Sequence, residues 1–137
     1  MCYDAEFPLL GRRMIELGAD WILVPSCTDT EAGYHRMKIC CQARALENQC
    51  CVVQSPTFGT VPWSSEVDEN VGAAAIYTPV DRGFPANGIL VIGERNQPCW
   101  IKGELNLAAT KEVRLLGQVL NDRDWEKSAI GNCQPRS

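Results

Sequence analysis

The sequence predicts an α/β fold, because helix-type and strand-type patterns alternate along its first half. Apolar residues recur at helical spacing over residues 7–17 and about 34–48. A short continuous apolar run follows each of these segments, at 21–24 and at 50–53. Such runs are typical of strands in a helix-covered sheet. The order helix, strand, helix, strand therefore indicates helices layered against one sheet.

The first predicted helix, residues 7–17, has sequence signals at both of its ends. Pro8 lies in the first turn, where the missing amide hydrogen costs nothing, and Gly18 follows the last turn as a stop signal. Its apolar stripe is predicted to consist of Leu10, Met14 and Leu17. The run that follows, Trp21-Ile22-Leu23-Val24, ends at Pro25 and predicts a strand buried on both faces.

The second predicted helix, about 34–48, carries a charged pair beside its apolar stripe. The stripe is predicted to consist of Met37, Cys40, Cys41 and Ala45. Arg44 falls next to it, and Glu47 lies one turn further on. Two arrangements are open: the pair packs against the core, or it is a solvated surface pair.

Beyond residue 55 the sequence changes character. Prolines, glycines and a polar stretch at 64–70 predict a long loop, and apolar runs at 73–78, 89–92 and 99–105 predict an antiparallel meander. Asp81-Arg82-Gly83 reads as a turn between two of these strands. Asn106 is a predicted cap for a helix over 107–117 that ends at Gly117, and residues 126–137 form a polar tail.

Composition excludes several classes of protein. The 137 residues contain 45% hydrophobic residues, and 13 Lys and Arg stand against 17 Asp and Glu. Without an apolar stretch near the ~20 residues of a membrane span, we expect no membrane partner. Because the positive charges are scattered rather than clustered, we expect no nucleic-acid partner.

Eight cysteines raise the question of disulfides or zinc. The chain shows no secretory signal pattern, so we expect free thiols in a reducing, cytoplasmic compartment. No C-x-x-C pair is present, and the side chains of Cys40-Cys41 and Cys50-Cys51 point in different directions on any helix or strand. We therefore expect no metal and no cofactor.

The cysteine with the clearest chemical potential is Cys2, which precedes the first predicted helix. Helix amides favour an anion there, so such a thiol is inclined to react as a thiolate. The same amides can stabilise an oxyanion when a carbonyl or nitrile carbon is attacked. An alternative is an N-terminal nucleophile that uses its own α-amine as base. Such enzymes open with a strand, whereas Phe7-Pro8 leads into a helix.

Three motifs occur in order: Cys2-Tyr3-Asp4-x-x-Phe7-Pro8, Gly18-Ala19-Asp20-x-Ile22-Leu23-Val24-Pro25-Ser26, and Ala43-Arg44-Ala45-Leu46-Glu47-Asn48-Gln49-Cys50. With them the chain resembles the carbon–nitrogen hydrolase (nitrilase) family from residue 1 to about 125. The resemblance covers the second half of the family's domain. It implies the C-terminal half of an α-β-β-α sandwich, with a broad apolar face left uncovered.

The resemblance also implies roles for particular residues. Cys2 would be the nucleophile that forms a thioester with a small amide or nitrile, and the backbone amide of Tyr3 would help to hold the oxyanion. Ser26, Cys27 and Thr28, after the first strand, would border the substrate pocket. Arg44 and Glu47 would form a structural pair, which favours the core arrangement.

The same resemblance implies features that these residues do not supply. The family's glutamate base and lysine precede the cysteine, and no residue here matches them. We therefore expect a truncated piece that is inactive by itself. Family members associate through the helices that match 7–17 and 34–48, which implies a homo-oligomer. The alternative is a catalytically inert fragment or an oligomerising module.

Overall fold

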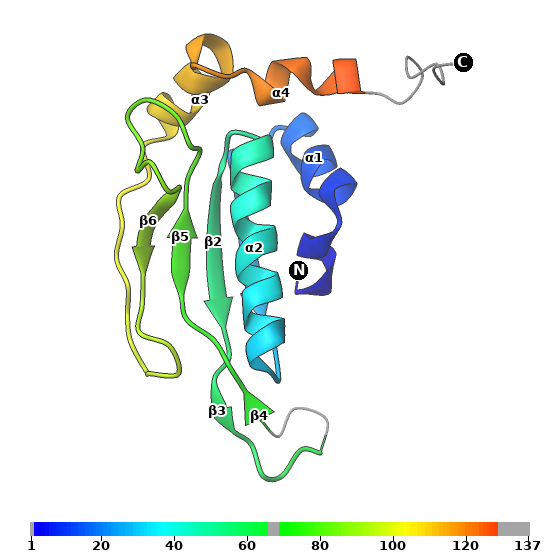
Figure 1. The fold of residues 1–137 in the computed structure, drawn as a ribbon, viewed down its shortest axis with the longest axis vertical. Coiled ribbons are helices and arrows are strands. Elements are labelled where there is room, and N and C mark those ends of the chain that lie inside the picture. Colours follow the sequence, from blue (N-terminus) through cyan, green and yellow to red (C-terminus); the bar gives the residue numbers. More distant parts are fainter. Residues whose placement is uncertain (1, 66–68, 129–137) are drawn as a thin grey trace, which may run out of the picture.

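The computed structural model describes residues 2–65 and 69–128, which form a mixed four-stranded sheet with helices on one face (Figure 1). The strand order is β1-β2-β5-β6. Helix α2 lies in front of this sheet, and α1 lies beside α2. The predicted α/β class is confirmed. The strands are β1 (Trp21–Ser26), β2 (Cys51–Pro56), β3 (Gly59–Thr60), β4 (Glu69–Asn70), β5 (Ala75–Tyr77) and β6 (Ile89–Ile92).

The parallel pair β1 and β2 is joined by α2 (Glu31–Glu47), as a parallel connection requires. The register pairs Trp21 with Cys51 and Ser26 with Pro56, so both strands end at the same edge of the sheet. Helix α2 begins three residues before the predicted position 34. The reason is its cap: the Thr30 hydroxyl accepts a hydrogen bond from the Gly33 amide at 3.0 Å.

The antiparallel part of the sheet contains two of the three predicted strands. β5 pairs with β2 and β6 pairs with β5, which confirms the strands expected at 73–78 and 89–92. The strand predicted at 99–105 is wrong, because this segment forms no ladder. It packs across the sheet instead, and a Cβ on Gly103 would lie only 3.0 Å from Ile76 and Leu90. The predicted long loop contains the small β3–β4 pair.

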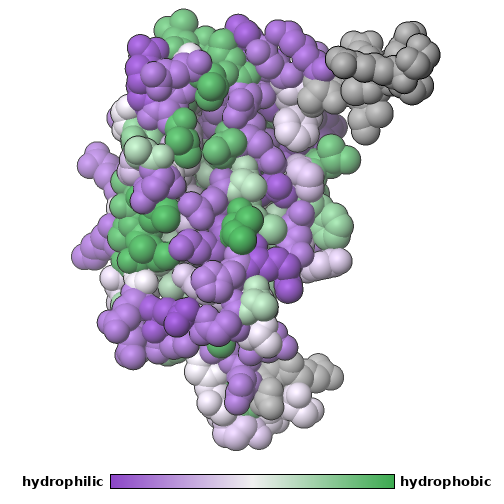
Figure 2. Space-filling model, in the orientation of Figure 1, coloured by the Kyte–Doolittle hydropathy of each residue, from purple (hydrophilic) through white to green (hydrophobic). Residues whose placement is uncertain are grey.

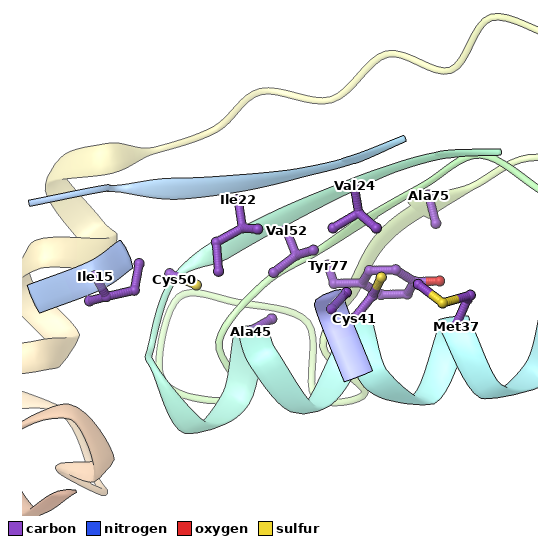
Figure 3. Packing of buried hydrophobic residues seen from close by; sticks show 11 residues of the cluster. Ile15, Ile22, Val24, Met37, Cys41, Ala45, Cys50, Val52, Ala75 and Tyr77 are labelled. Atoms are coloured by element: carbon purple, nitrogen blue, oxygen red, sulfur yellow. The ribbon is translucent and has the colours of Figure 1, made fainter. Parts of the chain in front are cut away.

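The core lies between α2 and the inner face of the sheet (Figure 3). Ile22 and Val24 of β1 and Val52 of β2 point toward Cys41 and Ala45 of α2, with Tyr77 between the layers. Each of these side chains is almost completely buried. Burying one Val or Ile contributes about 1.5–3 kcal/mol, so this contact is the main source of stability for the layer pair.

The outer face of β1 is not buried, contrary to the prediction. Burial alternates along the strand, and Trp21 and Leu23 are 48% and 56% exposed. The continuous apolar run could not distinguish a doubly covered strand from one covered on a single face. The exposed pair agrees with the expectation of an uncovered apolar face.

Helix α1 (Pro8–Glu16) has the predicted limits but a different buried face. Gly11 and Ile15 are buried, and Met14 of the predicted stripe packs against the core, whereas Leu10 and Leu17 of that stripe are 41% and 71% exposed. The cause is the close packing on α2: a Cβ on Gly11 would lie 2.8 Å from Arg44 Cδ. The leucines point away from the core.

The predicted C-terminal helix is confirmed as α3 (Leu107–Leu116). The Asn106 side chain accepts a hydrogen bond from the Ala109 amide at 2.9 Å, and Gly117 is the C-cap. The chain continues through α4 (Asn121–Asp124) and the 3-10 helix η2 (Trp125–Ser128). Most of the predicted polar tail, residues 129–137, lies outside the described residues.

Asp81 does more than make the turn that the sequence predicts between β5 and β6. Its carboxylate accepts hydrogen bonds from the Arg82 amide at 2.6 Å and from the Gln118 amide, 3.0 Å from each oxygen. Burial opposes ionisation, but the amides of Gln118, Arg82 and Val119 outweigh it and hold the pKa of Asp81 below its usual value. The carboxylate therefore fixes the end of α3 to the sheet.

Replacing Asp81 with asparagine is expected to lower the free energy of unfolding by about 1–3 kcal/mol, because the amide satisfies fewer of these backbone donors. A lowered pKa stabilises the fold above the unfolded value of about 3.9, and this contribution disappears as pH falls through the folded value. Urea unfolding at several pH values measures both effects. Asp29→Asn is the matched control, since Asp29 is exposed. Equal losses in both variants would contradict the anchoring role.

Candidate active site

Cys2 lies at the start of a short 3-10 helix, η1 (Tyr3–Glu6), rather than directly before an α-helix. α1 begins only at Pro8, after an extended Phe7. The helix that Cys2 directly precedes is therefore this 3-10 helix, and not the α-helix whose amides were expected beside the thiol. Tyr3 follows Cys2 directly, and its ring packs edge-to-face on Phe7 with centroids 5.0 Å apart. Both rings are turned toward solvent, since Tyr3 is 66% and Phe7 48% exposed.

The Cys2 thiol faces the main chain of Cys27, which follows β1. The Cys27 amide donates to Cys2 Sγ at 3.4 Å, and the thiol donates to the Cys27 carbonyl oxygen at the same distance. These residues are 25 positions apart in sequence. The chain thus brings Cys2 to the loop Ser26–Thr28. This loop lies at the carboxyl edge of the parallel pair, where α/β proteins commonly bind ligands.

Backbone hydrogen bonds on both sides hold the Ser26–Thr28 loop. The Thr57 amide donates to the Ser26 carbonyl oxygen at 2.9 Å. Thr28 pairs with Val71 twice, through its carbonyl oxygen and through its hydroxyl, both at 2.7 Å. The loop is therefore joined to the ends of β2 and β4, which gives the thiol a fixed surface to face.

Asn70 is a residue of this site that the sequence did not indicate. Its Oδ1 accepts from the Cys27 thiol and from the Thr57 hydroxyl, each at 2.8 Å. Asn70 is buried, at 6% exposure, although it lies in the polar stretch that reads as a loop. It is 43 residues from Cys27 in the chain, so no local pattern connects the two.

Arg44 holds η1, and with it Cys2, against α2. Its Nη1 donates to the Ala5 carbonyl oxygen at 3.0 Å, and its Nε lies 2.6 Å from Glu47 Oε1. The two side chains are 8% and 22% exposed, so the pair lies against the core rather than in water. A second tie is more exposed: Arg36 donates to Glu6 at 2.6 Å.

The cysteines near the site differ in chemical state. Cys27 is exposed and Cys2 is half-buried, and the seven cysteines of residues 2–65 and 69–128 are free thiols. Burial raises the pKa of Cys41, and separately that of Cys50, to about 12. It also raises the pKa of Cys40. The buried thiols therefore stay protonated at neutral pH and behave as small apolar side chains.

Comparison with known proteins identifies relatives of the chain. No family model matches the chain. It is 36% identical over 124 residues to the Probable hydrolase YhcX of Bacillus subtilis, a match that covers 90% of this chain and 24% of that protein. It is 30% identical to the Deaminated glutathione amidase of Synechocystis and to the 2-oxoglutaramate amidase of Paenarthrobacter nicotinovorans. These matches cover 83% and 89% of this chain, and 38% and 37% of those proteins.

Solved structures agree with the sequence matches. The C. elegans NitFhit protein superposes with a TM-score of 0.61 at 23% identity, over 82% of this chain and 25% of that one. Nit3 of Saccharomyces cerevisiae, a member of branch 10 of the nitrilase superfamily, superposes with a TM-score of 0.56 at 21% identity, over 82% and 38%. The chain belongs to the nitrilase superfamily of carbon–nitrogen hydrolases. The predicted family is confirmed.

This nitrilase-superfamily chain spans about a quarter to two-fifths of the length of the curated relatives it matches. Its fold is a mixed α/β fold that matches part of the solved nitrilase-superfamily structures. Every helix in the described part of the chain is too short or too polar to cross a bilayer. Residues 2–65 and 69–128 contain no group of three or more His, Cys, Asp or Glu that could hold a metal ion.

Proposed function

We propose that this chain supplies the cysteine nucleophile of a hydrolase that cleaves non-peptide carbon–nitrogen bonds in small amides or nitriles. One observation carries the proposal: the Cys2 thiol lies against the Cys27 backbone at the carboxyl edge of β1 and β2. The named relatives supply the chemistry, because two of them are amidases. A half-buried thiol beside the Ser26–Thr28 loop, which hydrogen bonds hold in place, is a suitable nucleophile.

With an amide, the sulfur of Cys2 bonds to the amide carbon, the C–N bond breaks, and the amine leaves with the proton of the thiol to give a thioester. With a nitrile, the thiol first adds across the C–N triple bond to give a thioimidate, and one water then adds before ammonia leaves to give the same thioester. Water then attacks the thioester carbon, the C–S bond breaks, and the acid leaves while the thiol is restored. The backbone amide of Tyr3 stabilises the oxyanion in both steps. Ser26, Cys27 and Thr28 border the substrate on the opposite side.

The proposal needs a base and a cation that these 137 residues do not provide in recognisable motifs. The glutamate and lysine implied by the family resemblance would reach Cys2 from outside this part of the fold. They would come with a second layer covering the exposed outer face of β1 around Trp21 and Leu23. The 137-residue chain by itself is therefore expected to turn over short amides negligibly.

Trapping the thioester tests the nucleophile directly. The protein purified from its native cells is mixed with short amides and ω-amide acids and quenched in acid, and its tryptic peptides are weighed. An acyl group on the peptide of residues 1–12, which carries Cys2, is the expected result. An acyl group on Cys27 instead, within residues 14–36, would overturn the assignment.

A second proposal is that copies of the chain associate through α1 and α2, in line with the homo-oligomer expected from residues 7–17 and 34–48. Hydrophobic side chains stand out on the side formed by α1 and on α2 (Figure 2). Three of them are more than 60% exposed: Leu9 of α1, Leu17 directly after α1, and Ile39 of α2. A non-catalytic oligomerising module would use the same surface.

Light scattering during size-exclusion chromatography measures the association of the purified protein. We expect an oligomer that Leu9→Glu dissociates, because a charge in a buried apolar contact is unfavourable. Leu115→Glu on α3 is the matched control, since Leu115 is equally exposed but lies on another helix. A monomeric unsubstituted protein at micromolar concentration would contradict the proposal.

A further inference from the structure

We propose that Cys2 and Cys27 form a reversible disulfide, which makes this pair an oxidant-sensitive modification site. The disulfide would occupy the sulfur that the proposed reaction uses, so peroxide would switch the site off and a dithiol would restore it. Only this regulatory consequence rests on the proposed function. The disulfide itself rests on the geometry of two thiols.

The two residues are in direct contact in the reduced chain. Cys2 Sγ lies 3.4 Å from both the amide nitrogen and the carbonyl oxygen of Cys27, so the sulfur faces the middle of that residue. This contact is compatible with the roughly 4.4–6.8 Å between Cα atoms that a disulfide spans. Rotation of the Cys27 side chain about its Cα–Cβ bond is the movement that joins the sulfurs.

That rotation is opposed by little. The Cys27 thiol now donates to Asn70 Oδ1 at 2.8 Å, and one such hydrogen bond contributes only about 1 kcal/mol net. Asn70 keeps its second donor, the Thr57 hydroxyl. Cys27 is exposed, so core packing does not restrict the rotation of its side chain, and an oxidant in solution can reach its sulfur.

The neighbouring cysteines are poorer partners for Cys2. Cys41 is close enough for its ionisation to respond to Cys2, but it is completely buried, and burial raises its pKa to about 12. Cys40 is half-buried, and burial raises its pKa as well. Thiol–disulfide chemistry requires an accessible sulfur that can lose its proton, which favours Cys27.

The chemistry balances with a peroxide as oxidant. The Cys2 sulfur attacks hydrogen peroxide, an S–O bond forms as the O–O bond breaks, and one water leaves after proton transfer. The resulting sulfenic acid is attacked by the Cys27 sulfur, so that the S–S bond forms as the S–O bond breaks. The departing hydroxide takes the Cys27 proton and leaves as a second water. Two thiols and one peroxide give one disulfide and two waters.

Peptide mapping tests the disulfide without any assay of activity. The protein purified from its native cells is treated with one equivalent of hydrogen peroxide, its remaining thiols are alkylated, and it is digested with trypsin without reductant. Trypsin separates Cys2, Cys27 and the pair Cys40-Cys41 into peptides 1–12, 14–36 and 39–44. A linked pair of the first two peptides that dithiothreitol removes is the expected result. Linkage of 1–12 to 39–44, or no linkage, would overturn the inference.

Substitutions extend the test to recovery. In Cys27→Ala, peroxide is expected to carry Cys2 on to sulfinic acid, which dithiothreitol cannot reverse. The recoverable Cys2 thiol should then fall at least about tenfold relative to the unsubstituted protein. Cys99→Ala is the matched control, because Cys99 is also exposed but lies beside Ser55 of β2 and Ile76 of β5 rather than beside Cys2. Equal recovery in both variants would contradict the resolving role of Cys27.

The two proposals fail in distinguishable ways. A mapped Cys2–Cys27 disulfide in a protein that is purified from its native cells and shows no amide turnover would support the modification site and contradict the proposed function. Amide turnover without the disulfide would support the proposed function and contradict the modification site.

Discussion

Replacing Cys2 with alanine is expected to lower ammonia release from short amides by at least about 10³-fold, because the proposed reaction forms its thioester on the Cys2 sulfur. The substitution is made in the native gene, so that the protein is assayed with all of its chain. Alanine fills most of the same space beside the core, so the free energy of unfolding should change little. Steady-state ammonia release and urea unfolding, measured on the same preparation, separate the two effects.

Cys99→Ala is the control for this loss, since it removes an exposed thiol that lies beside β2 and β5 rather than at Cys2. It should leave the rate of ammonia release unchanged. If Cys2→Ala retained more than about a tenth of the rate, another group would be the nucleophile and the proposed function would be wrong.

Replacing Arg44 with alanine is expected to lower the free energy of unfolding by about 3–5 kcal/mol, the usual cost of removing one partner from a buried ion pair. The change leaves the Ala5 carbonyl oxygen without its 3.0 Å donor and Glu47 without its cation. It also leaves a space beside Gly11, which lies close to the Arg44 side chain in the unsubstituted protein. Urea unfolding followed by circular dichroism measures the loss.

Arg36→Ala is the matched control, because Arg36 also joins α2 to η1 but does so at the surface. Its side chain is 57% exposed beside Glu6, and because water screens exposed pairs, the loss should be much smaller. Arg44→Lys, which keeps the charge but not the fork of donors, should fall between the two. Similar losses for Arg44→Ala and Arg36→Ala would show that burial of the pair contributes nothing.

The sequence predicted correctly those features of the fold that depend on interactions between neighbouring residues, such as the ends of helices. Helix α3 has its cap at Asn106 and its end at Gly117, as expected, because capping depends on neighbouring residues. The buried face of α1 was wrong because it depends on Arg44 of another helix. Whether 99–105 pairs as a strand or packs across a sheet is likewise a tertiary choice that its apolar content does not encode.

The candidate site shows the same division. Cys2 and the Ser26–Thr28 loop were identified from motifs, and the fold brings them into contact. Asn70 could not be found, because its partners Cys27 and Thr57 are 43 and 13 residues away and its own neighbourhood is polar. The hydrogen bond from Arg44 to the Ala5 carbonyl oxygen could not be predicted either, because its acceptor is a backbone atom that any residue carries.

Because side chains of α2 hold η1, the position of the Cys2 thiol depends on where α2 lies. Arg44 and Arg36 hold the turn that begins at Cys2, while the loop facing Cys2 belongs to the sheet. A shift of α2 along the sheet would therefore change the distance between Cys2 Sγ and Cys27. A shift by one helical turn is about 5.4 Å. Helix α2 also presents Ile39 to solvent, so a partner bound to that surface would contact the same helix that positions the Cys2 sulfur.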